Sequence, residues 1–137
     1  MLTSLPAYGL TNLNNSKRQH RISRHRRVRA KVFGTAEKPR VSVFKSNRHV
    51  FVQFIDDSAH KTILSSAVSV GVPTKASGQS KSKLMTKTDK ATKTGEMLAE
   101  KAKEAGIKEI IFDRGGFKYH GRVKAIAEGL RKGGLKF

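Results

Sequence analysis

Residues 112–123 read FDRGGFKYHGRV, and the rest of the chain is interpreted around this stretch. A buried strand is predicted to end at Phe112, and a helix is predicted to begin near His120. The loop between them is rich in glycine, which permits tight turns and close approach of a ligand. It also carries cations and aromatic rings, which suit phosphates and exposed bases. An ordinary strand-to-helix turn would also use glycine, so the loop alone leaves both interpretations open.

The charge of the whole chain favours a polyanionic partner. The 137 residues contain 29 Lys and Arg against 10 Asp and Glu, which gives a formal net charge of +19. Self-repulsion at this charge disfavours the compact free protein, and a bound polyanion would relieve it. Nucleic acid is the commonest such partner, and an anionic membrane surface is the main rival.

The composition also excludes several classes of site. The chain has no Cys, so it has no disulfide framework and no thiolate metal site. No apolar run approaches the roughly 18 residues of a membrane helix, and residues 1–16 do not resemble a secretory signal. No Walker-type phosphate loop occurs. We therefore expect one compact domain with a tail, with no cofactor, no metal and no membrane partner.

The most basic segment is residues 17–31, in which eight of fifteen residues are Lys or Arg and none is acidic. In water such a run is predicted to be disordered or a frayed helix. As a helix it would place Arg21, Arg24 and Arg27 along one side and leave only Ile22 and Val28 to touch a core. Arginine-rich segments often become ordered on binding RNA. RNA contact is favoured over a solvated tail or a localisation signal.

Hydrophobic periodicity predicts a small α/β domain with a mixed sheet. The predicted order is strand-strand-strand-helix-strand-helix, with a basic N-terminal arm. The strands are expected at residues 40–45, 49–55, 62–67 and 109–112, and the helices at 84–105 and from about 120 to 132. Small and apolar residues form one stripe along the first helix, and Lys90 lies off it; the stripe consists of Leu84, Thr88, Ala91, Gly95, Leu98, Ala102 and Ala105. Residues 1–16 are predicted to be a flexible extension, residues 17–33 the arm, and residues 34–137 the compact domain with a mobile loop near 71–83.

Two long stretches carry a family resemblance. Residues 113–125, DRGGFKYHGRVKA, resemble the C-terminal signature of the large-subunit ribosomal protein L-eighteen family. Residues 34–50, GTAEKPRVSVFKSNRHV, resemble its N-terminal signature, and the ending GLKF at 134–137 is also similar. The likeness covers roughly residues 17 to 137. Residues 1–16 and the lysine-rich residues 71–83 depart from the family pattern.

The resemblance implies a structural protein of the large ribosomal subunit and not an enzyme. Its implied partners are 5S rRNA, 23S rRNA and neighbouring ribosomal proteins including protein L-five, in the central protuberance. The implied location is the cytoplasm, and the lack of a clear transit segment favours a bacterial over an organellar origin. The predicted RNA-binding residues are Lys17, Arg18, Arg21, Arg24, His25, Arg26, Arg27, Arg29, Lys31, Lys45, Asn47, Arg48, His49, Arg114, Lys118, Tyr119, His120 and Arg122.

These residues divide by the contact expected of them. The arginines of the arm are assigned to phosphates, which position a protein without reading sequence. Base or ribose contacts are assigned to Asn47, Arg48, His49, Tyr119 and His120. Phe117 has two interpretations, because it could stack on a base or be buried in the core.

Two other functions are compatible with parts of the sequence. A metal-dependent nuclease could use Asp56, Asp57, Asp113 and His120. However, Asp56 and Asp57 have the simpler interpretation of a turn, and Asp113 is expected to pair with Arg114 or Arg122. A nonspecific DNA or membrane-surface binder would need only charge. For membranes a basic helix with bulky apolar residues is expected, and residues 17–31 have few.

Overall fold

The computed structural model describes residues 13–66 and 86–137, with side chains described from Ser16 onward. Residues 1–12 of the predicted extension 1–16 and the predicted loop at 71–83 therefore lie outside the described residues. The last four residues of that extension, 13–16, belong to a helix. No helix in the described part is long and apolar enough to span a membrane. The elements in chain order are α1 (Leu13–Lys31), β1 (Arg40–Lys45), β2 (Val50–Asp56), β3 (Lys61–Ser65), α3 (Lys87–Glu104), β4 (Ile111–Asp113) and α4 (Arg122–Lys132).

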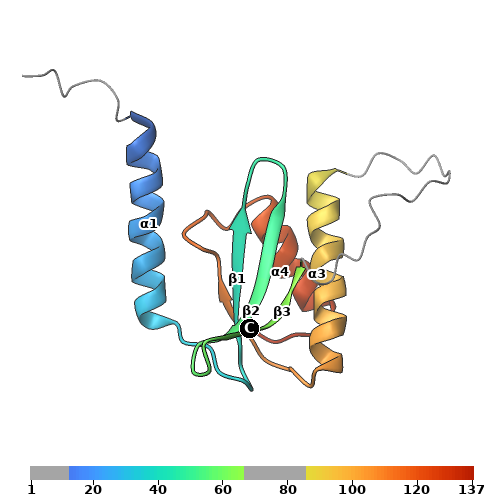
Figure 1. The fold of residues 1–137 in the computed structure, drawn as a ribbon. Coiled ribbons are helices and arrows are strands. Elements are labelled where there is room, and N and C mark those ends of the chain that lie inside the picture. The colour runs from blue at the N-terminus through green and yellow to red at the C-terminus, as the bar shows by residue number, and fades with distance from the viewer. Residues whose placement is uncertain (1–12, 67–85) are drawn as a thin grey trace, which may run out of the picture.

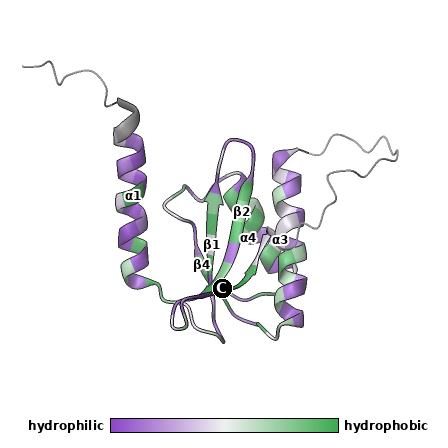
Figure 2. Ribbon diagram, viewed as in Figure 1, coloured by the Kyte–Doolittle hydropathy of each residue, from purple (hydrophilic) through white to green (hydrophobic). Residues whose placement is uncertain are grey.

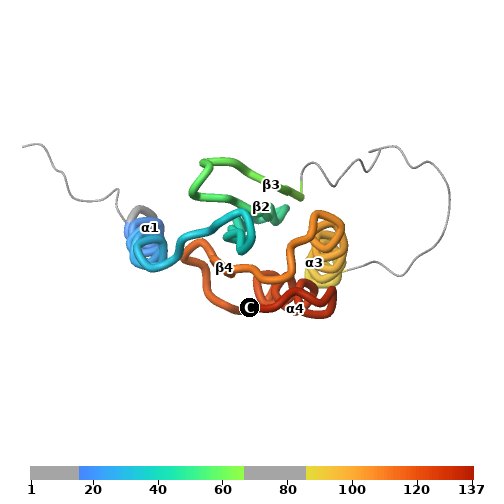
Figure 3. Tube along the Cα trace, turned by 90° about the horizontal axis from the view of Figure 1, so that it is seen from below, coloured from blue at the N-terminus to red at the C-terminus, as the bar shows by residue number. Residues whose placement is uncertain are grey.

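The strands form one mixed sheet, which confirms the predicted fold class. Their spatial order is β3-β2-β1-β4. β1 pairs antiparallel with β2 and parallel with β4, and β2 pairs antiparallel with β3. α3 and α4 lie together at one side of the sheet, and α1 stands at the other, in both Figure 1 and Figure 3. α1 and the two packed helices thus belong to opposite sides of the molecule.

The core lies between the sheet and the α3–α4 pair. Val41 and Val43 alternate along β1 with side chains that face away, as expected for the period of a strand. Leu98 of α3 and Ile126 of α4 are fully buried against them. Figure 2 shows hydrophobic residues gathered on the central strands, whereas α1 is mostly hydrophilic. α1 is therefore not part of this core.

The two packed helices approach closely through glycine. A Cβ built on Gly95 of α3 would lie 2.6 Å from the carbonyl oxygen of Ile126 and 3.1 Å from the Cα of Gly129. The facing Gly129 is equally restricted, because its Cβ would lie close to the carbonyl oxygen of Thr92. No side chain can be added at this crossing without moving one helix backbone. The small residues of the predicted α3 stripe therefore set the distance between the helices.

A buried ion cluster joins the strands to the segments around them. Arg40, the first residue of β1, is only 2% exposed. Its Nε and Nη2 donate hydrogen bonds of 2.8 and 2.9 Å to the two carboxylate oxygens of Asp57. Its Nη1 donates a third bond of 3.0 Å to Oδ2 of Asp113, which is fully buried. This two-point geometry suits the planar guanidinium.

Both carboxylates reach beyond Arg40. Asp57 accepts a 2.9 Å hydrogen bond from the backbone N–H of Gly34, in the segment that follows α1. Asp113 accepts a 2.9 Å hydrogen bond from the backbone N–H of Gly115, at the start of the loop after β4. The cluster thus fixes the positions of the segment after α1, the turn after β2 and the loop after β4.

The predicted pairing of Asp113 with Arg114 or Arg122 is wrong. Adjacent residues at the end of a strand point to opposite faces of the sheet, so Arg114 is poorly placed to pair with its neighbour. The parallel register of β1 and β4 places Asp113 opposite Ser42. Ser42 lies on the same face as Arg40, two residues earlier in β1. Arg40 therefore reaches Asp113 diagonally across the strand pair.

The cluster shifts the pKa of its members in the direction that keeps them charged. Hydrogen bonds from Arg40 are the main cause that lowers the pKa of Asp57 far below its ordinary value, and the Gly34 N–H adds to the effect. The bonds to Asp57 raise the pKa of Arg40, against the opposing effect of burial. Both groups are thus ionised at neutral pH, and the pair stabilises the fold as charges.

Gly95→Ala tests the close crossing of α3 and α4. Overpacking costs about 1–3 kcal/mol, and the better helix propensity of Ala offsets at most about 1 kcal/mol. We expect a net loss of about 1–2 kcal/mol in the free energy of unfolding, measured by chemical denaturation. Glu100→Ala, at an exposed position of the same helix, should change it by less than about 0.5 kcal/mol. A more stable Gly95→Ala protein would contradict the close packing.

Asp57→Asn tests the ion cluster. Removing one partner of a buried pair typically costs about 3–5 kcal/mol, and since Asn keeps one acceptor oxygen we expect about 3 kcal/mol at neutral pH. Because the folded pKa of Asp57 is lowered, its contribution is fully present above its ordinary pKa of about 3.9. It is lost as the pH falls below that value. The difference in the free energy of unfolding between wild type and variant should therefore become smaller in acid. Chemical denaturation between about pH 7 and pH 3 would measure it.

An exposed ion pair provides the control for this titration. Lys38 and Glu109 lie 3.5 Å apart with both side chains about half exposed. Glu109→Gln should change the stability by less than about 1 kcal/mol at any pH, because surface pairs contribute little. If the difference in the free energy of unfolding between wild type and Asp57→Asn stays constant through the acid range, Asp57 is not the group that titrates.

Candidate RNA interface

α1 contacts the glycine-rich loop through the residues near its middle. Arg24 Nε donates a 3.2 Å hydrogen bond to the carbonyl oxygen of Gly116. The guanidinium carbon of Arg21 lies 4.7 Å from the centre of the Phe117 ring, which is the geometry of a cation–π contact. His25 Nε2 lies 3.4 Å from Oδ2 of the buried Asp113. Cationic and imidazole side chains thus hold the arm to the domain.

Gly116 makes this contact possible. Its φ is +76°, a backbone conformation that L side chains rarely adopt, and a Cβ there would lie 2.5 Å from the carbonyl oxygen of Arg21. The loop backbone therefore touches the helix backbone directly. The sequence predicted glycine for a tight turn or for close approach of a ligand, and here it permits close approach of α1.

A basic cleft of about 310 Å³ lies between α1 and this loop. None of the residues that line it is acidic, and six of the eight are predicted RNA-binding residues. The lining residues are Lys17, Arg21, Arg24, Lys45, Gly116, Phe117, Lys118 and His120. Side chains from α1, β1 and the loop therefore meet at one surface, although Lys17 and His120 are more than 100 residues apart in the sequence.

Phe117 lines the cleft and is neither fully buried nor fully exposed. Its ring packs edge-on against Phe44, with the ring centres 6.2 Å apart. Arg21 and Lys45 lie over the ring, with Lys45 Nζ 5.6 Å from its centre. A base that stacks on Phe117 would therefore have to displace one of these cations, so the ring mainly positions positive charge.

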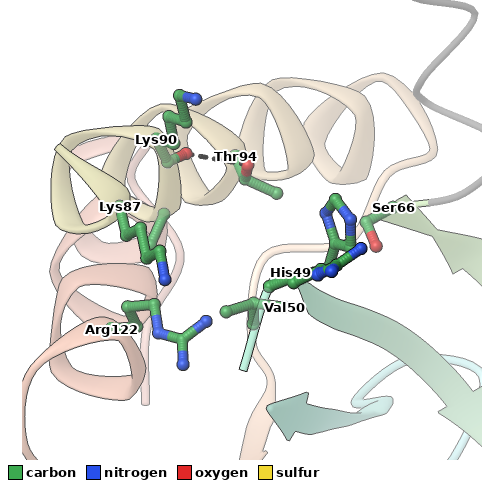
Figure 4. Close-up of a pocket in the computed structure, with 9 residues that line it drawn as sticks. His49, Val50, Ser66, Lys87, Lys90, Thr94 and Arg122 are labelled. Carbon is green, nitrogen blue, oxygen red and sulfur yellow. Dashed lines mark hydrogen bonds between the residues drawn. The ribbon is translucent and has the colours of Figure 1, made fainter. Parts of the chain in front are cut away.

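A second basic cavity, of about 300 Å³, lies between the β1–β2 turn and the first turns of α3 and α4. Figure 4 shows Lys87 and Arg122 on its helical side and His49 and Val50 on its strand side. Its lining residues are Arg48, His49, Val50, Ser66, Lys87, Lys90, Ala91, Thr94 and Arg122. The structure thus places six predicted site residues in the cleft beside α1 and three others, Arg48, His49 and Arg122, in this second cavity.

Most of the remaining cations of α1 are exposed around the helix. Arg18, Arg26, Arg27 and Lys31 are all exposed. The apolar contacts expected of the arm are weak, because Ile22 is 36% exposed. Polar and charged side chains make the contacts instead, since the loop offers α1 a carbonyl group, a carboxylate and an aromatic ring.

Several predicted site residues take part in the fold. The guanidinium of Arg29 lies 3.7 Å from the carboxylate of Asp57. The hydroxyl of Tyr119 accepts a 3.2 Å hydrogen bond from Arg131, outside the cleft. Asn47 contributes its backbone carbonyl, which accepts a hydrogen bond from Lys87. Arg114 is half-buried beside the cluster.

Sequence reasoning missed four residues of these sites. Arg40 was assigned only to a strand, and Asp57 was assigned to a turn or, in the nuclease hypothesis, to a metal. In the structure the two residues bind each other and hold the arm and the loop in place. Lys87 was assigned no role, and Lys90 was expected only to lie off the apolar stripe of its helix. Both are exposed, as a position off the stripe predicts, and both also line the second cavity. The available signal was their spacing of three residues in the first turn of a helix, which puts them on one face.

The carboxylates considered for a nuclease are already occupied. Arg40 binds both Asp57 and Asp113. Asp56 accepts hydrogen bonds from the backbone and hydroxyl of Ser58, which lower its pKa in the turn after β2. Among the described residues, no group of three His, Cys, Asp or Glu side chains is arranged to hold a metal ion. His120 lies among cations in the cleft.

Comparisons with known proteins identify the family of this chain. Residues 15–137 match the family described as ribosomal L18 of archaea, bacteria, mitochondria and chloroplast. The large ribosomal subunit protein uL18 of Staphylococcus haemolyticus is 48% identical over 124 residues, which cover 88% of this chain and 95% of the relative. The protein of the same name from Clostridium botulinum is 47% identical, covering 90% and 97%.

A third relative shows a similar degree of likeness. The uL18 protein of Thermotoga petrophila is 45% identical over 124 residues, with 89% of this chain and 96% of the relative covered. The matched region includes α1, the sheet, the glycine-rich loop and α4. The chain therefore belongs to the ribosomal L18 family.

Proposed function

We propose that this chain is a structural constituent of the large ribosomal subunit that binds 5S rRNA. In this role it helps attach 5S rRNA to 23S rRNA in the central protuberance, beside neighbouring proteins including protein L-five. The relatives named above are large-subunit proteins, which supports the ribosomal part of the proposal. The observation that carries RNA binding is the basic cleft between α1 and the glycine-rich loop, which contains no acidic residue.

The arm binds RNA as a positioned helix in this proposal. α1 is held by Arg24 and His25 on one side, while Arg26 and Arg27 remain exposed for phosphates. Fixing the helix before binding lowers the conformational entropy lost when RNA binds. Phosphate contacts then place the protein on the RNA, and the cleft residues approach sugars and base edges. The arm and the loop thus form one interface.

A membrane surface fits this arrangement poorly. A helix that binds membranes buries bulky apolar residues at the lipid boundary. The large apolar side chains in the described part of α1 are those of Ile22, which is partly exposed, and Val28, which is half-buried. They are too few for such a contact. Nonspecific nucleic-acid binding differs only in selectivity, so the decisive experiment compares RNAs.

Competition binding at near-physiological salt tests the proposed function. We expect the full chain to prefer 5S rRNA over an unrelated RNA of the same length, and removal of residues 1–31 to lower the affinity for 5S rRNA by at least about tenfold. The affinity should fall steeply with salt, because phosphate contacts release counterions. Filter binding or fluorescence anisotropy would measure both effects.

A double substitution at exposed positions distinguishes the loss of phosphate contacts from the loss of folded structure. Arg26→Gln with Arg27→Gln removes two exposed charges of α1 and should flatten the slope of log affinity against log salt by about 1.4 to 1.8. Lys108→Gln with Lys136→Gln removes two exposed charges elsewhere and should leave the slope unchanged. Equal affinity of the wild type for both RNAs would reject specific 5S binding in favour of a nonspecific binder.

Gly116→Ala tests whether the docked position of α1 matters for binding. Its Cβ would collide with the backbone of α1, so we expect faster amide hydrogen exchange at residues 21–25 and about tenfold weaker 5S binding. Gly121→Ala is the control, because Gly121 also has positive φ but open space around it. Equal effects of the two variants on exchange in α1 would mean that loop strain, and not helix contact, is responsible.

A further inference from the structure

The second basic cavity concentrates positive charge that the fold does not neutralise. Arg48, His49, Lys87, Lys90 and Arg122 line it, and none of its lining residues is acidic. Figure 4 shows the nitrogen-bearing ends of Lys87 and Arg122 turned toward each other, while the amino group of Lys90 points away from them. Like charges held this close repel one another unless an anion lies between them.

Lys87 and Arg122 are both fixed in place by the β1–β2 turn. Lys87 Nζ donates a 3.1 Å hydrogen bond to the carbonyl oxygen of Asn47. Arg122 Nη2 donates a 2.8 Å hydrogen bond to the carbonyl oxygen of Ser46. Two helices and a turn thus hold the two cations in a set geometry, so little side-chain entropy remains to be lost on binding.

Arg122 also has an unused donor. Its Nη1 is buried and has no hydrogen-bond partner among the described residues. A buried N–H group without an acceptor is unfavourable, and a guanidinium presents its N–H groups in a fork that matches two phosphate oxygens. The orphaned group is therefore available to an acceptor that lies outside the described residues.

The N-terminus of α4 also favours a bound anion. Arg122 is the first residue of α4, whose N-terminus has no side-chain cap and no acidic residue in its first turn. The start of α3 differs, because Thr86 and Asp89 cap it reciprocally. The free N–H groups and positive dipole end of α4 therefore favour an anion beside Arg122.

We propose that this cavity binds one phosphodiester group of an RNA strand, separately from the cleft beside α1. The proposal rests on the proposed RNA-binding function and adds a second phosphate site to it. Lys87 supplies a point charge, Arg122 supplies the buried donor and the end of α4, and His49 and Arg48 close the strand side. A small apolar ligand is a poor fit, because cations dominate the cavity.

Phosphate ethylation interference tests this site and identifies its source. Ethylated 5S rRNA and, separately, ethylated 23S rRNA are bound to full-length wild type, Lys87→Gln and Lys101→Gln. We expect one phosphate whose ethylation weakens binding of the wild type and of Lys101→Gln but has no effect on Lys87→Gln. Whether this phosphate lies in 5S or in 23S rRNA identifies the RNA that binds in the cavity.

Lys101→Gln is the matched control, because it removes the same charge from the last turn of the same helix. Lys87→Gln should flatten the slope of log affinity against log salt by about 0.7 to 0.9, the value for one phosphate, and Lys101→Gln should leave it unchanged. Arg122→Lys keeps the charge but removes the planar guanidinium donor. Ethylation of the same phosphate should therefore weaken RNA binding by this variant less than it weakens binding by wild type.

The outcomes separate this proposal from the proposed function. If wild type selects 5S rRNA but Lys87→Gln gives the same interference pattern and salt slope as wild type on both RNAs, the cavity holds no RNA phosphate. The cavity would then be assigned to a carboxylate of a protein partner. If wild type fails to select 5S rRNA, the proposed function itself fails. Denaturation of each variant confirms that it is folded before its binding is compared.

Discussion

The bonds of Arg40 to Asp57 and Asp113 are the constraint on which the rest of the structure depends. Breaking a buried ion pair is costly because it leaves an uncompensated charge in the interior, so the segments that carry these residues are held in one arrangement. The carboxylates extend that constraint, since Asp57 binds the segment after α1 and Asp113 binds the glycine-rich loop. A basic arm without a hydrophobic face thus acquires a defined position.

The two basic surfaces follow from that arrangement. α1 touches the loop through Gly116 because nothing larger than a hydrogen atom fits there, and the cleft forms where their cations converge. The second cavity forms where the β1–β2 turn meets the starts of α3 and α4. Self-repulsion at a net charge of +19 disfavours such clusters in the free protein. An RNA polyanion would remove that penalty, so binding and stability are coupled.

Much of the fold was predictable because its signals are local. Alternation in β1 and β2 and the helical stripe of α3 arise from side chains that are close in the sequence, and each predicts its own element. The stripe was less reliable at its ends, since Thr88 and Ala105 are exposed. The strand expected at 109–112 is Ile111–Asp113 in the structure, and Glu109 instead forms a bridge with Lys136. Boundaries depend on such distant partners, which periodicity does not contain.

The sequence by itself determined the class of the protein: a basic chain with the L18 signatures, an arginine-rich arm and a mixed α/β domain. The tertiary structure alone decided which charges are available to a ligand. Arg29, Arg40 and Asp113 lie in stretches that were predicted to bind RNA or to form a simple strand, yet they stabilise the fold. Lys87 and Lys90 gained a candidate role through the cavity they line. The reason is physical, because a charge is paired or free according to neighbours that are tens of residues away, and only folding brings those neighbours together.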